Sequence, residues 1–223
     1  MSDFKLERIN MVESQIRPNA VTNPDLLKAL AETPRELFVP PSQRALAYID
    51  GVLLVENARE HRAARHLLSP MVFAKLAQLA DIRRGDRILD VGGATGYSAA
   101  ILARLGASVV ALENDAGLTA VAKEALAGAG VKNVSFVMGP LEAGAPESAP
   151  FDVIFMNGRV GHLPESLLAQ LAERGRLVTI MGNDTAAKAT LVSKIDSRIQ
   201  RRTAFDADAP ILPGFELKSA FVF

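Results

Sequence analysis

The chain has no cysteine, no net charge and no long hydrophobic run. The absence of cysteine from its 223 residues excludes disulfides, thiolate metal sites and a cysteine nucleophile. Because 25 basic and 25 acidic residues balance, no general attraction to nucleic acid or to membrane surfaces is expected. No apolar run approaches the roughly 20 residues of a membrane-spanning helix, and the charged N-terminal stretch has no apolar signal core. These absences predict a soluble cytoplasmic protein without a metal site.

What the chain does have is a regular alternation of apolar strands and helices from Pro70 onward. Hydrophobic residues make up 49% of the sequence, which is enough for a substantial core at this length. Strands are predicted at 87–91, 108–112, 133–137, 152–157 and 176–181, and helices at 71–79, 97–105, 116–128 and 164–173. This order predicts an α/β fold with a doubly wound, mostly parallel sheet and right-handed crossovers.

The two ends of the chain depart from this alternation. Helices are predicted at 10–17 and from Asn23, which is a favourable N-cap followed by proline. Strands with no long helix between them are predicted at 190–195, 199–206 and 216–223. These C-terminal strands predict an antiparallel hairpin that completes the sheet edge. We expect residues 1–70 to form a helical extension with a loop, and residues 71–223 to form the main domain, the two making one compact unit.

The most informative feature is the glycine turn that follows the first strand of the regular region. Its glycines, Gly92, Gly93 and Gly96, do not have the G-x-G-x-x-G spacing of a dinucleotide site. Asp90 precedes the first of them by two positions, where it would repel a pyrophosphate but attract an ammonium group. Glu113, at the tip of the next strand, is placed to accept hydrogen bonds from both ribose hydroxyls. S-adenosylmethionine, which has an ammonium group and no phosphate, fits both acids.

Other interpretations of these residues stay open at this point. The turn can be a tight strand-to-helix connection with a solvated Glu113 and no ligand. A nicotinamide oxidoreductase is disfavoured by the glycine spacing. Met138 and Met156, at the ends of the third and fourth strands, either border the ligand or belong to ordinary core packing.

Segments spread along the whole chain resemble the signatures of one enzyme family. The segments are 11–17, 34–40, 47–50, 88–100, 149–154, 164–171 and 175–178. Together they resemble the protein-L-isoaspartate O-methyltransferases, and the N-terminal signatures are more specific than the cofactor motif at 88–100. The resemblance implies a Rossmann-like, class I S-adenosylmethionine-dependent methyltransferase fold. It also implies carboxyl methylation of L-isoaspartyl residues in damaged proteins, a repair reaction that yields S-adenosyl-L-homocysteine.

The resemblance and the glycine turn together define a set of candidate cofactor-binding residues. The set is Asp90, Gly92, Gly93, Ala94, Gly96, Tyr97, Glu113, Asn114, Gly139, Pro140, Leu141 and Asn157. The expected partner is a protein or peptide with an isoaspartyl carboxylate, or a small anionic acceptor, with no role for nucleic acid or membrane.

Three segments depart from the family's pattern. When the chains are anchored on Pro70, Leu68 stands where the family has a serine beside the acceptor carboxylate, and Ser69 is one residue away. Ser69 is therefore the candidate catalytic residue of an altered acceptor-side loop. The family's Gly-Asp-Gly after the third strand is replaced by Gly139-Pro-Leu, and Arg159 adds a bulky cation to a segment of small residues.

These departures leave alternative functions open. The cation-rich segment 59–66 either grips an anionic acceptor or is a solvated surface. A hydroxyl or amine acceptor would require a general base, for which His66 and His162 are candidates. The chain can also be a methyltransferase-fold protein with a different acceptor, or a non-catalytic protein that binds the cofactor or a partner.

Overall fold

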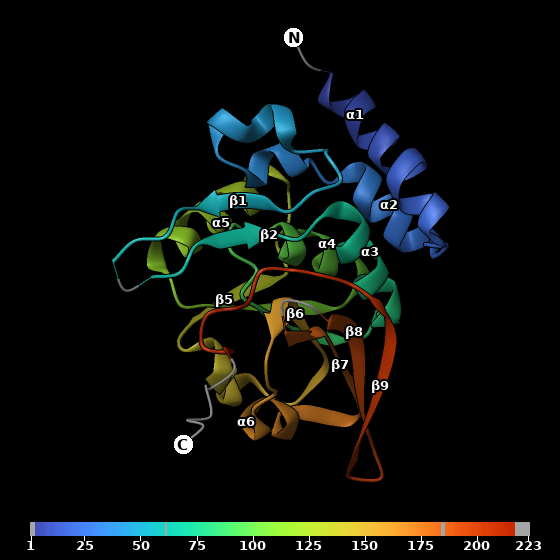
Figure 1. Cartoon of the computed structure of the whole chain (residues 1–223), viewed down its shortest axis with the longest axis vertical. Helices are drawn as coiled ribbons and strands as arrows, with labels where there is room; N and C mark the ends of the chain where they lie inside the picture. Colours follow the sequence, from blue (N-terminus) through green and yellow to red (C-terminus); the bar gives the residue numbers. More distant parts are fainter. Residues whose placement is uncertain (1–2, 61, 184–185, 217–223) are drawn as a thin grey trace.

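A seven-stranded sheet forms the centre of the computed structural model, which describes residues 3–60, 62–183 and 186–216 (Figure 1). The strand order is β5-β4-β3-β6-β7-β8-β9. Five strands run parallel: β3 (Arg87–Val91), β4 (Ser108–Glu113), β5 (Val134–Met138), β6 (Phe151–Val160) and β7 (Leu171–Asn183). The hairpin of β8 (Ala186–Ile195) and β9 (Arg198–Asp206) pairs antiparallel with β7 at the edge. This arrangement confirms the mostly parallel sheet with a C-terminal antiparallel hairpin.

Helices precede the sheet and lie on both of its faces. They are α1 (Phe4–Met11), α2 (Pro24–Glu32), α3 (Pro70–Leu79), α4 (Tyr97–Leu105), α5 (Ala116–Gly128) and α6 (Glu165–Ala169). The side chain of Asn23 caps α2 by accepting a hydrogen bond from the backbone N–H of Leu26, as its sequence predicts. The first helix begins at Phe4 rather than at residue 10. The helix predicted at 164–173 ends at Ala169, because Leu171 pairs with Phe151 and joins the sheet.

The two faces of the sheet support two hydrophobic cores, because side chains alternate along each strand. Ile88, Val109 and Phe155 point toward α2, α3, α4 and α5, in a core that also includes residues of α1. Leu89, Val110 and Met156 point toward α6 and the segment that follows β9. Helices from before and after residue 70 share the first core, and the domain boundary at that residue stays a prediction.

Residues 51–67 contain a small separate hairpin. Its strands, β1 (Leu53–Glu56) and β2 (Arg65–Leu67), form a two-stranded antiparallel sheet, and among the described residues neither strand pairs through its backbone with a strand of the main sheet. Alternation places Leu67 and Arg65 on the same, buried side of β2, with His66 between them half exposed. The hairpin therefore directs one cation inward, toward the carboxyl ends of β3 and β4.

The segment after β9 returns across the carboxyl edge of the sheet, below β2 in Figure 1 (red). It pairs with the far end of β6, where the backbone N–H of Arg159 donates to the carbonyl of Pro210 at 3.0 Å. The N–H of Leu212 donates to the carbonyl of Arg159 at 2.9 Å. The strand predicted at 216–223 cannot be compared, since 217–223 lie outside the described residues and Glu216 is in no strand.

Within residues 3–60, 62–183 and 186–216, none of the helices has the length and hydrophobicity that a membrane crossing requires.

Candidate active site

The glycine turn connects β3 to α4 at the carboxyl edge of the sheet. Gly92 has φ 68° and Gly96 has φ 90°, backbone conformations that favour glycine. Ala94 also has a positive φ, of 51°, a conformation that costs some strain in a residue other than glycine. The N–H of Gly92 donates to the carbonyl of Leu112 at 2.9 Å, which fixes the turn against the end of β4. The turn therefore brings the tips of β3 and β4 together.

Asp90 is completely buried at the end of β3. Its two carboxylate oxygens accept hydrogen bonds from the Ser98 hydroxyl at 2.7 Å and from the Asn157 side-chain amide at 2.6 Å. Burial raises the pKa of Asp90 to about 6, although both hydrogen bonds lower it, and the nearby Glu113 raises it further. Asp90 is thus held in one orientation by residues from α4 and β6.

We expect Asp90→Asn to stabilise the fold by about 2–3 kcal/mol at pH 7 and to have almost no effect near pH 4. The folded pKa of Asp90 lies above the ordinary 3.8, so between these values the folded state binds a proton that the unfolded state has lost. The ionised carboxylate therefore costs stability as pH rises through this window, and the full cost applies above about pH 6. Asparagine avoids the cost, because it can still accept from Asn157 and donate to Ser98.

Urea unfolding of the wild type and Asp90→Asn at both pH values measures this difference. The exposed Asp50→Asn is the matched control and should change the unfolding free energy by less than about 0.5 kcal/mol. A destabilising effect of Asp90→Asn at pH 7 would contradict the claim that the ionised Asp90 carboxylate lowers the stability of the fold.

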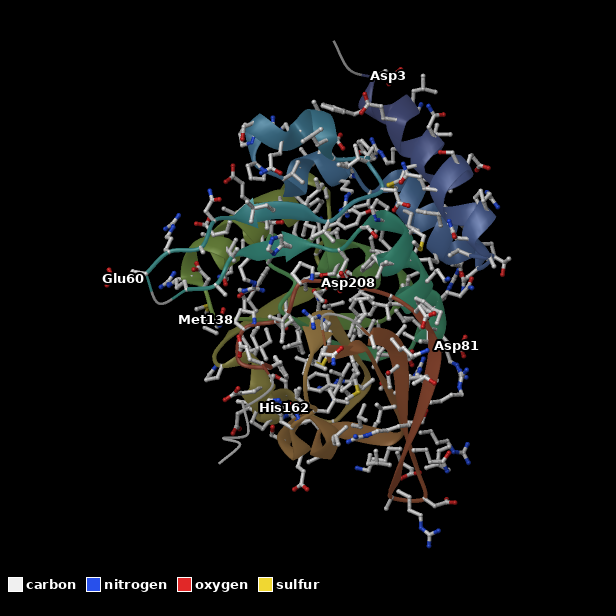
Figure 2. All side chains as sticks on the ribbon, viewed as in Figure 1. Asp3, Glu60, Asp81, Met138, His162 and Asp208 are labelled. Atoms are coloured by element: carbon white, nitrogen blue, oxygen red, sulfur yellow. The ribbon has the colours of Figure 1, made fainter. Side chains whose placement is uncertain are left out.

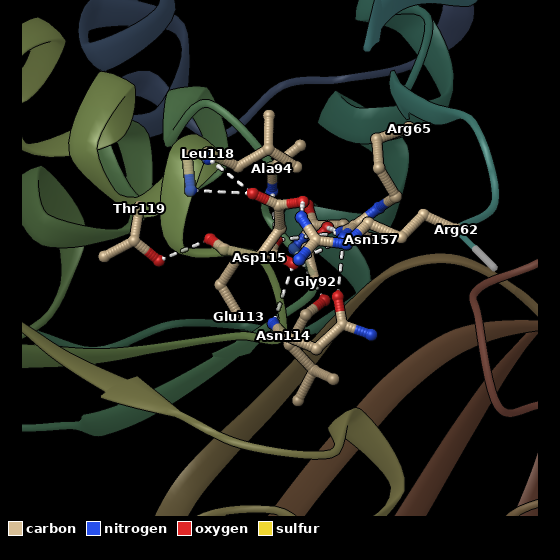
Figure 3. Close-up of polar contacts among 12 residues, drawn as sticks. Arg62, Arg65, Gly92, Ala94, Glu113, Asn114, Asp115, Leu118, Thr119 and Asn157 are labelled. Atoms are coloured by element: carbon tan, nitrogen blue, oxygen red, sulfur yellow. Dashed lines mark hydrogen bonds and ion pairs between the residues drawn. The ribbon is translucent and has the colours of Figure 1, made fainter. Parts of the chain in front are cut away.

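Glu113 is buried at the tip of β4, and its carboxylate is already engaged (Figure 3). Arg65 donates to both of its oxygens, one of them at 2.9 Å, in a bidentate ion pair. The backbone N–H groups of Ala94 and Asn114 donate to the same carboxylate at 3.1 Å and 2.9 Å. Arg65 also donates to the carbonyl of Gly92 at 2.9 Å. The Arg65 guanidinium therefore occupies the carboxylate of Glu113, the acid that the sequence analysis assigns to the ribose hydroxyls.

The surface of the glycine turn is covered by other parts of the chain. A methyl group added at Gly92 would lie 2.9 Å from Leu212, 3.2 Å from Leu141 and 3.2 Å from the Arg65 guanidinium. A cavity of about 200 Å³ lies beside Arg65 and reaches Asn114. This volume is below the roughly 300–1,000 Å³ of common small-molecule sites. The space above the turn is therefore occupied by the chain itself in this conformation.

The remaining candidate cofactor residues surround the same edge. The N–H of Gly139 donates to the carbonyl of Glu113 at 3.1 Å, which places Pro140 and Leu141 next to the end of β4. Tyr97 begins α4 with its ring buried under the Arg35 guanidinium, 4.4 Å from the ring centroid.

The two methionines that flank this edge have different surroundings. Met156 is fully buried in the core, as the packing interpretation predicts. Met138 is half exposed (Figure 2), and its sulfur accepts a hydrogen bond from the Thr119 hydroxyl at 3.1 Å.

The altered acceptor-side loop is well packed. Leu68 is buried, and its carbonyl accepts a hydrogen bond from Arg35 at 2.8 Å. The Ser69 hydroxyl accepts from the backbone N–H of Val72 at 3.4 Å and so serves as the N-cap of α3. The catalytic role of Ser69 stays a prediction. The buried side chain of Leu68 stands at the position where the resemblance implies a serine.

The other cations and bases singled out by sequence lie at different places. Arg159 is buried and donates to the carbonyl of Ala209 at 3.1 Å, so the segment after β9 engages it. His66 is half buried beside a cavity of about 10 Å³, and burial and the neighbouring Arg65 lower its pKa. His162 follows the end of β6 by two residues, with its ring centroid 6.1 Å from that of Phe215 (Figure 2). The structure therefore does not gather the two histidines at one place.

The chemistry of this edge suits S-adenosylmethionine, although the space does not yet admit it. Asp90 would hold the ammonium group and Glu113 the ribose hydroxyls, and the glycine turn would allow close approach of the ligand. Arg65 and Leu212 are the obstacles. Sequence reasoning missed both residues as parts of the site. The alternation of β2 was the available signal for Arg65, but the strand is only three residues long.

Comparison with known proteins gives consistent matches over most of the chain. The family model described as Protein-L-isoaspartate(D-aspartate) O-methyltransferase matches residues 7–206. A protein-L-isoaspartate O-methyltransferase of Methanoregula boonei is 36% identical over 192 residues, covering 86% of each chain. A solved protein-L-isoaspartate O-methyltransferase is 27% identical with a TM-score of 0.79, covering 94% of this chain and 66% of its own.

A second solved structure supports the fold alone. The beta-aspartate methyltransferase structure from Plasmodium falciparum, in complex with S-adenosyl-L-homocysteine, is 19% identical with a TM-score of 0.73. The alignment covers 91% of this chain and 96% of the Plasmodium falciparum chain. The Rossmann-like methyltransferase fold predicted from the sequence is confirmed. The chain belongs to the protein-L-isoaspartate O-methyltransferase family.

Proposed function

We propose that this chain is an S-adenosylmethionine-dependent O-methyltransferase that esterifies L-isoaspartyl carboxylates in damaged proteins. The observation that carries the proposal is the pair of buried acids, Asp90 and Glu113, on either side of the glycine turn in a chain of this family. A cytoplasmic location and a protein or peptide partner belong to the same proposal.

The reaction makes modest demands on the protein. Bound S-adenosylmethionine supplies a methyl group to a carboxylate oxygen and leaves as S-adenosyl-L-homocysteine. A carboxylate is ionised at pH 7, so it needs no general base, and the separate positions of His66 and His162 are compatible with this. The chain's contribution is to orient the reactants and to exclude water, and orientation alone is worth about 7–11 kcal/mol in well-aligned systems.

A second candidate is methylation of a different anionic acceptor by the same machinery. The observation that favours it is Leu68, whose buried apolar side chain replaces a hydroxyl beside the acceptor carboxylate of the family. A leucine side chain cannot donate a hydrogen bond to an isoaspartyl carboxylate. Recognition of that group would then depend on other donors near the loop.

Methyl incorporation into an isoaspartyl peptide, measured against the same peptide with a normal aspartyl residue, tests the proposal. We expect labelling of the isoaspartyl peptide only, and esters that close to a succinimide. Background labelling of both peptides by a protein that binds S-adenosyl-L-homocysteine would exclude repair and favour the second candidate.

A further inference from the structure

We propose that the β1–β2 hairpin is a lid whose Arg65 occupies the ribose-binding acid until the cofactor displaces it. The inference rests on the proposed function, because Glu113 is the acid assigned to the ribose. Arg65 would thus act as an internal competitor of the cofactor.

The hydrogen bonds of Glu113 show why Arg65 and the ribose hydroxyls of the cofactor cannot bind its carboxylate at the same time. A carboxylate has about four lone-pair positions that accept hydrogen bonds. The backbone N–H groups of Ala94 and Asn114 use two of them, one on each oxygen. The two Nη groups of Arg65 use the other two. Ribose hydroxyls can donate to Glu113 only after Arg65 has left.

Space leads to the same conclusion. Arg65 and Leu212 both lie against Gly92, where a ligand must approach the backbone of the turn. The neighbouring cavity of about 200 Å³, bordered by Asn114 and Pro213, is too small for a nucleoside ligand. Withdrawal of Arg65 would extend this cavity to the carboxylate of Glu113.

The hairpin is held in a way that allows its outer end to move. It is a separate two-stranded sheet, and such a pair has little stability of its own. Leu53 and Leu67 anchor its inner end in the core. At the outer end Arg62 pairs with Asp115, whose side chain is 15% exposed (Figure 3). The Arg62 side chain is 58% exposed, so water around the guanidinium weakens this ion pair.

The buried ion pair between Arg65 and Glu113 opens together with ligand binding, because its loss alone would leave a buried charge without a partner. Both side chains are almost inaccessible to water, at 6% and 4% exposure, so their attraction is offset by lost hydration. In the closed state Arg65 prevents Glu113 from being a buried, uncompensated charge. In the open state the guanidinium regains water, and the ligand hydroxyls satisfy Glu113.

Calorimetric titration with S-adenosyl-L-homocysteine tests the lid. We expect Arg65→Met, which keeps an unbranched apolar side chain but removes the guanidinium group, to bind about tenfold more tightly than the wild type or better, because the closed state is lost. Arg59→Met is the matched control, since Arg59 is on the same hairpin and pairs with Glu56 rather than Glu113. Its affinity should stay within about twofold of the wild type, because the closed population is unchanged.

Hydrogen exchange on the wild type keeps the proposal testable if Arg65→Met folds poorly. The amides of Arg59 and Arg62 donate to each other's carbonyls in the closed hairpin. Saturating S-adenosyl-L-homocysteine should speed their exchange while it slows exchange at the glycine turn.

The outcomes separate the lid from the proposed function. Wild-type binding that is unchanged or weakened by Arg65→Met, with no faster exchange in the hairpin, would overturn the lid and leave the function standing. Absence of binding to the wild type, Arg65→Met and Arg59→Met alike would overturn the proposed function itself.

Discussion

Glu113→Gln is expected to lower the free energy of unfolding by about 3 kcal/mol or more. The near-isosteric change leaves no cavity, but it removes the counterion of the buried Arg65. The glutamine amide would also place its NH2 group, which only donates, opposite other donors. These donors are the Arg65 guanidinium and a backbone N–H, which both donate to the carboxylate in the wild type. If Arg65 escapes to water instead, the β1–β2 hairpin should lose hydrogen-exchange protection.

The same substitution is expected to weaken binding of S-adenosyl-L-homocysteine at least about a hundredfold. Two hydrogen bonds to a charged acceptor contribute about 1.5–3 kcal/mol each, and a tenfold change in affinity corresponds to about 1.4 kcal/mol. Glu124→Gln, on the exposed side of α5, is the matched control and should leave stability and binding nearly unchanged. An unfolding free energy of Glu113→Gln within about 1 kcal/mol of the wild type would contradict the assigned ion pair.

Gly93→Ala is expected to weaken cofactor binding by more than tenfold and to lower stability by about 1–3 kcal/mol. A methyl group at this position would lie 2.5 Å from a carboxylate oxygen of Asp90 and 2.6 Å from the Ser98 hydroxyl. One of these buried groups must move, and their hydrogen bond of 2.7 Å would be broken or bent. The acid assigned to the ammonium group would then lose its orientation.

Gly85→Ala provides the control for this prediction. It precedes β3 in the same chain region, and a methyl group there meets nothing within 4 Å. Urea unfolding and calorimetry should therefore show no more than about 0.5 kcal/mol of change for Gly85→Ala. If Gly93→Ala and Gly85→Ala change stability and cofactor binding equally, the added methyl group at Gly93 does not act by crowding Asp90.

The sequence predicted the centre of the sheet well because β3, β4 and β6 are buried almost throughout and their continuous apolar runs are a strong local signal. The strand expected at 87–91 is Arg87–Val91, and the helices at 97–105 and 116–128 have those bounds. Strands β6 and β7 are longer than expected, since their extensions are stabilised by pairing with distant segments such as Pro210. Such nonlocal hydrogen bonds leave no periodic pattern in the sequence.

The candidate site shows the same division between local and nonlocal information. The motif predicted that Asp90, Glu113 and Asn157 would meet at one edge, and the parallel strands bring them together. It did not predict the ion pair between Arg65 and Glu113. Arg65 belongs to a segment with several cations, and the sequence of such a segment does not show whether an arginine binds a ligand or an acid of the same chain. The approach of Leu212 to Gly92 depends on the path of a segment 120 positions later in the chain.

The crystal structure of the wild-type chain with S-adenosyl-L-homocysteine is the most direct test of this account. We predict that the ribose hydroxyls bind Glu113, that the ligand's ammonium group lies at Asp90, and that Arg65 has left the carboxylate. A ligand bound elsewhere while Arg65 still contacts Glu113 would contradict both the cofactor site and the lid.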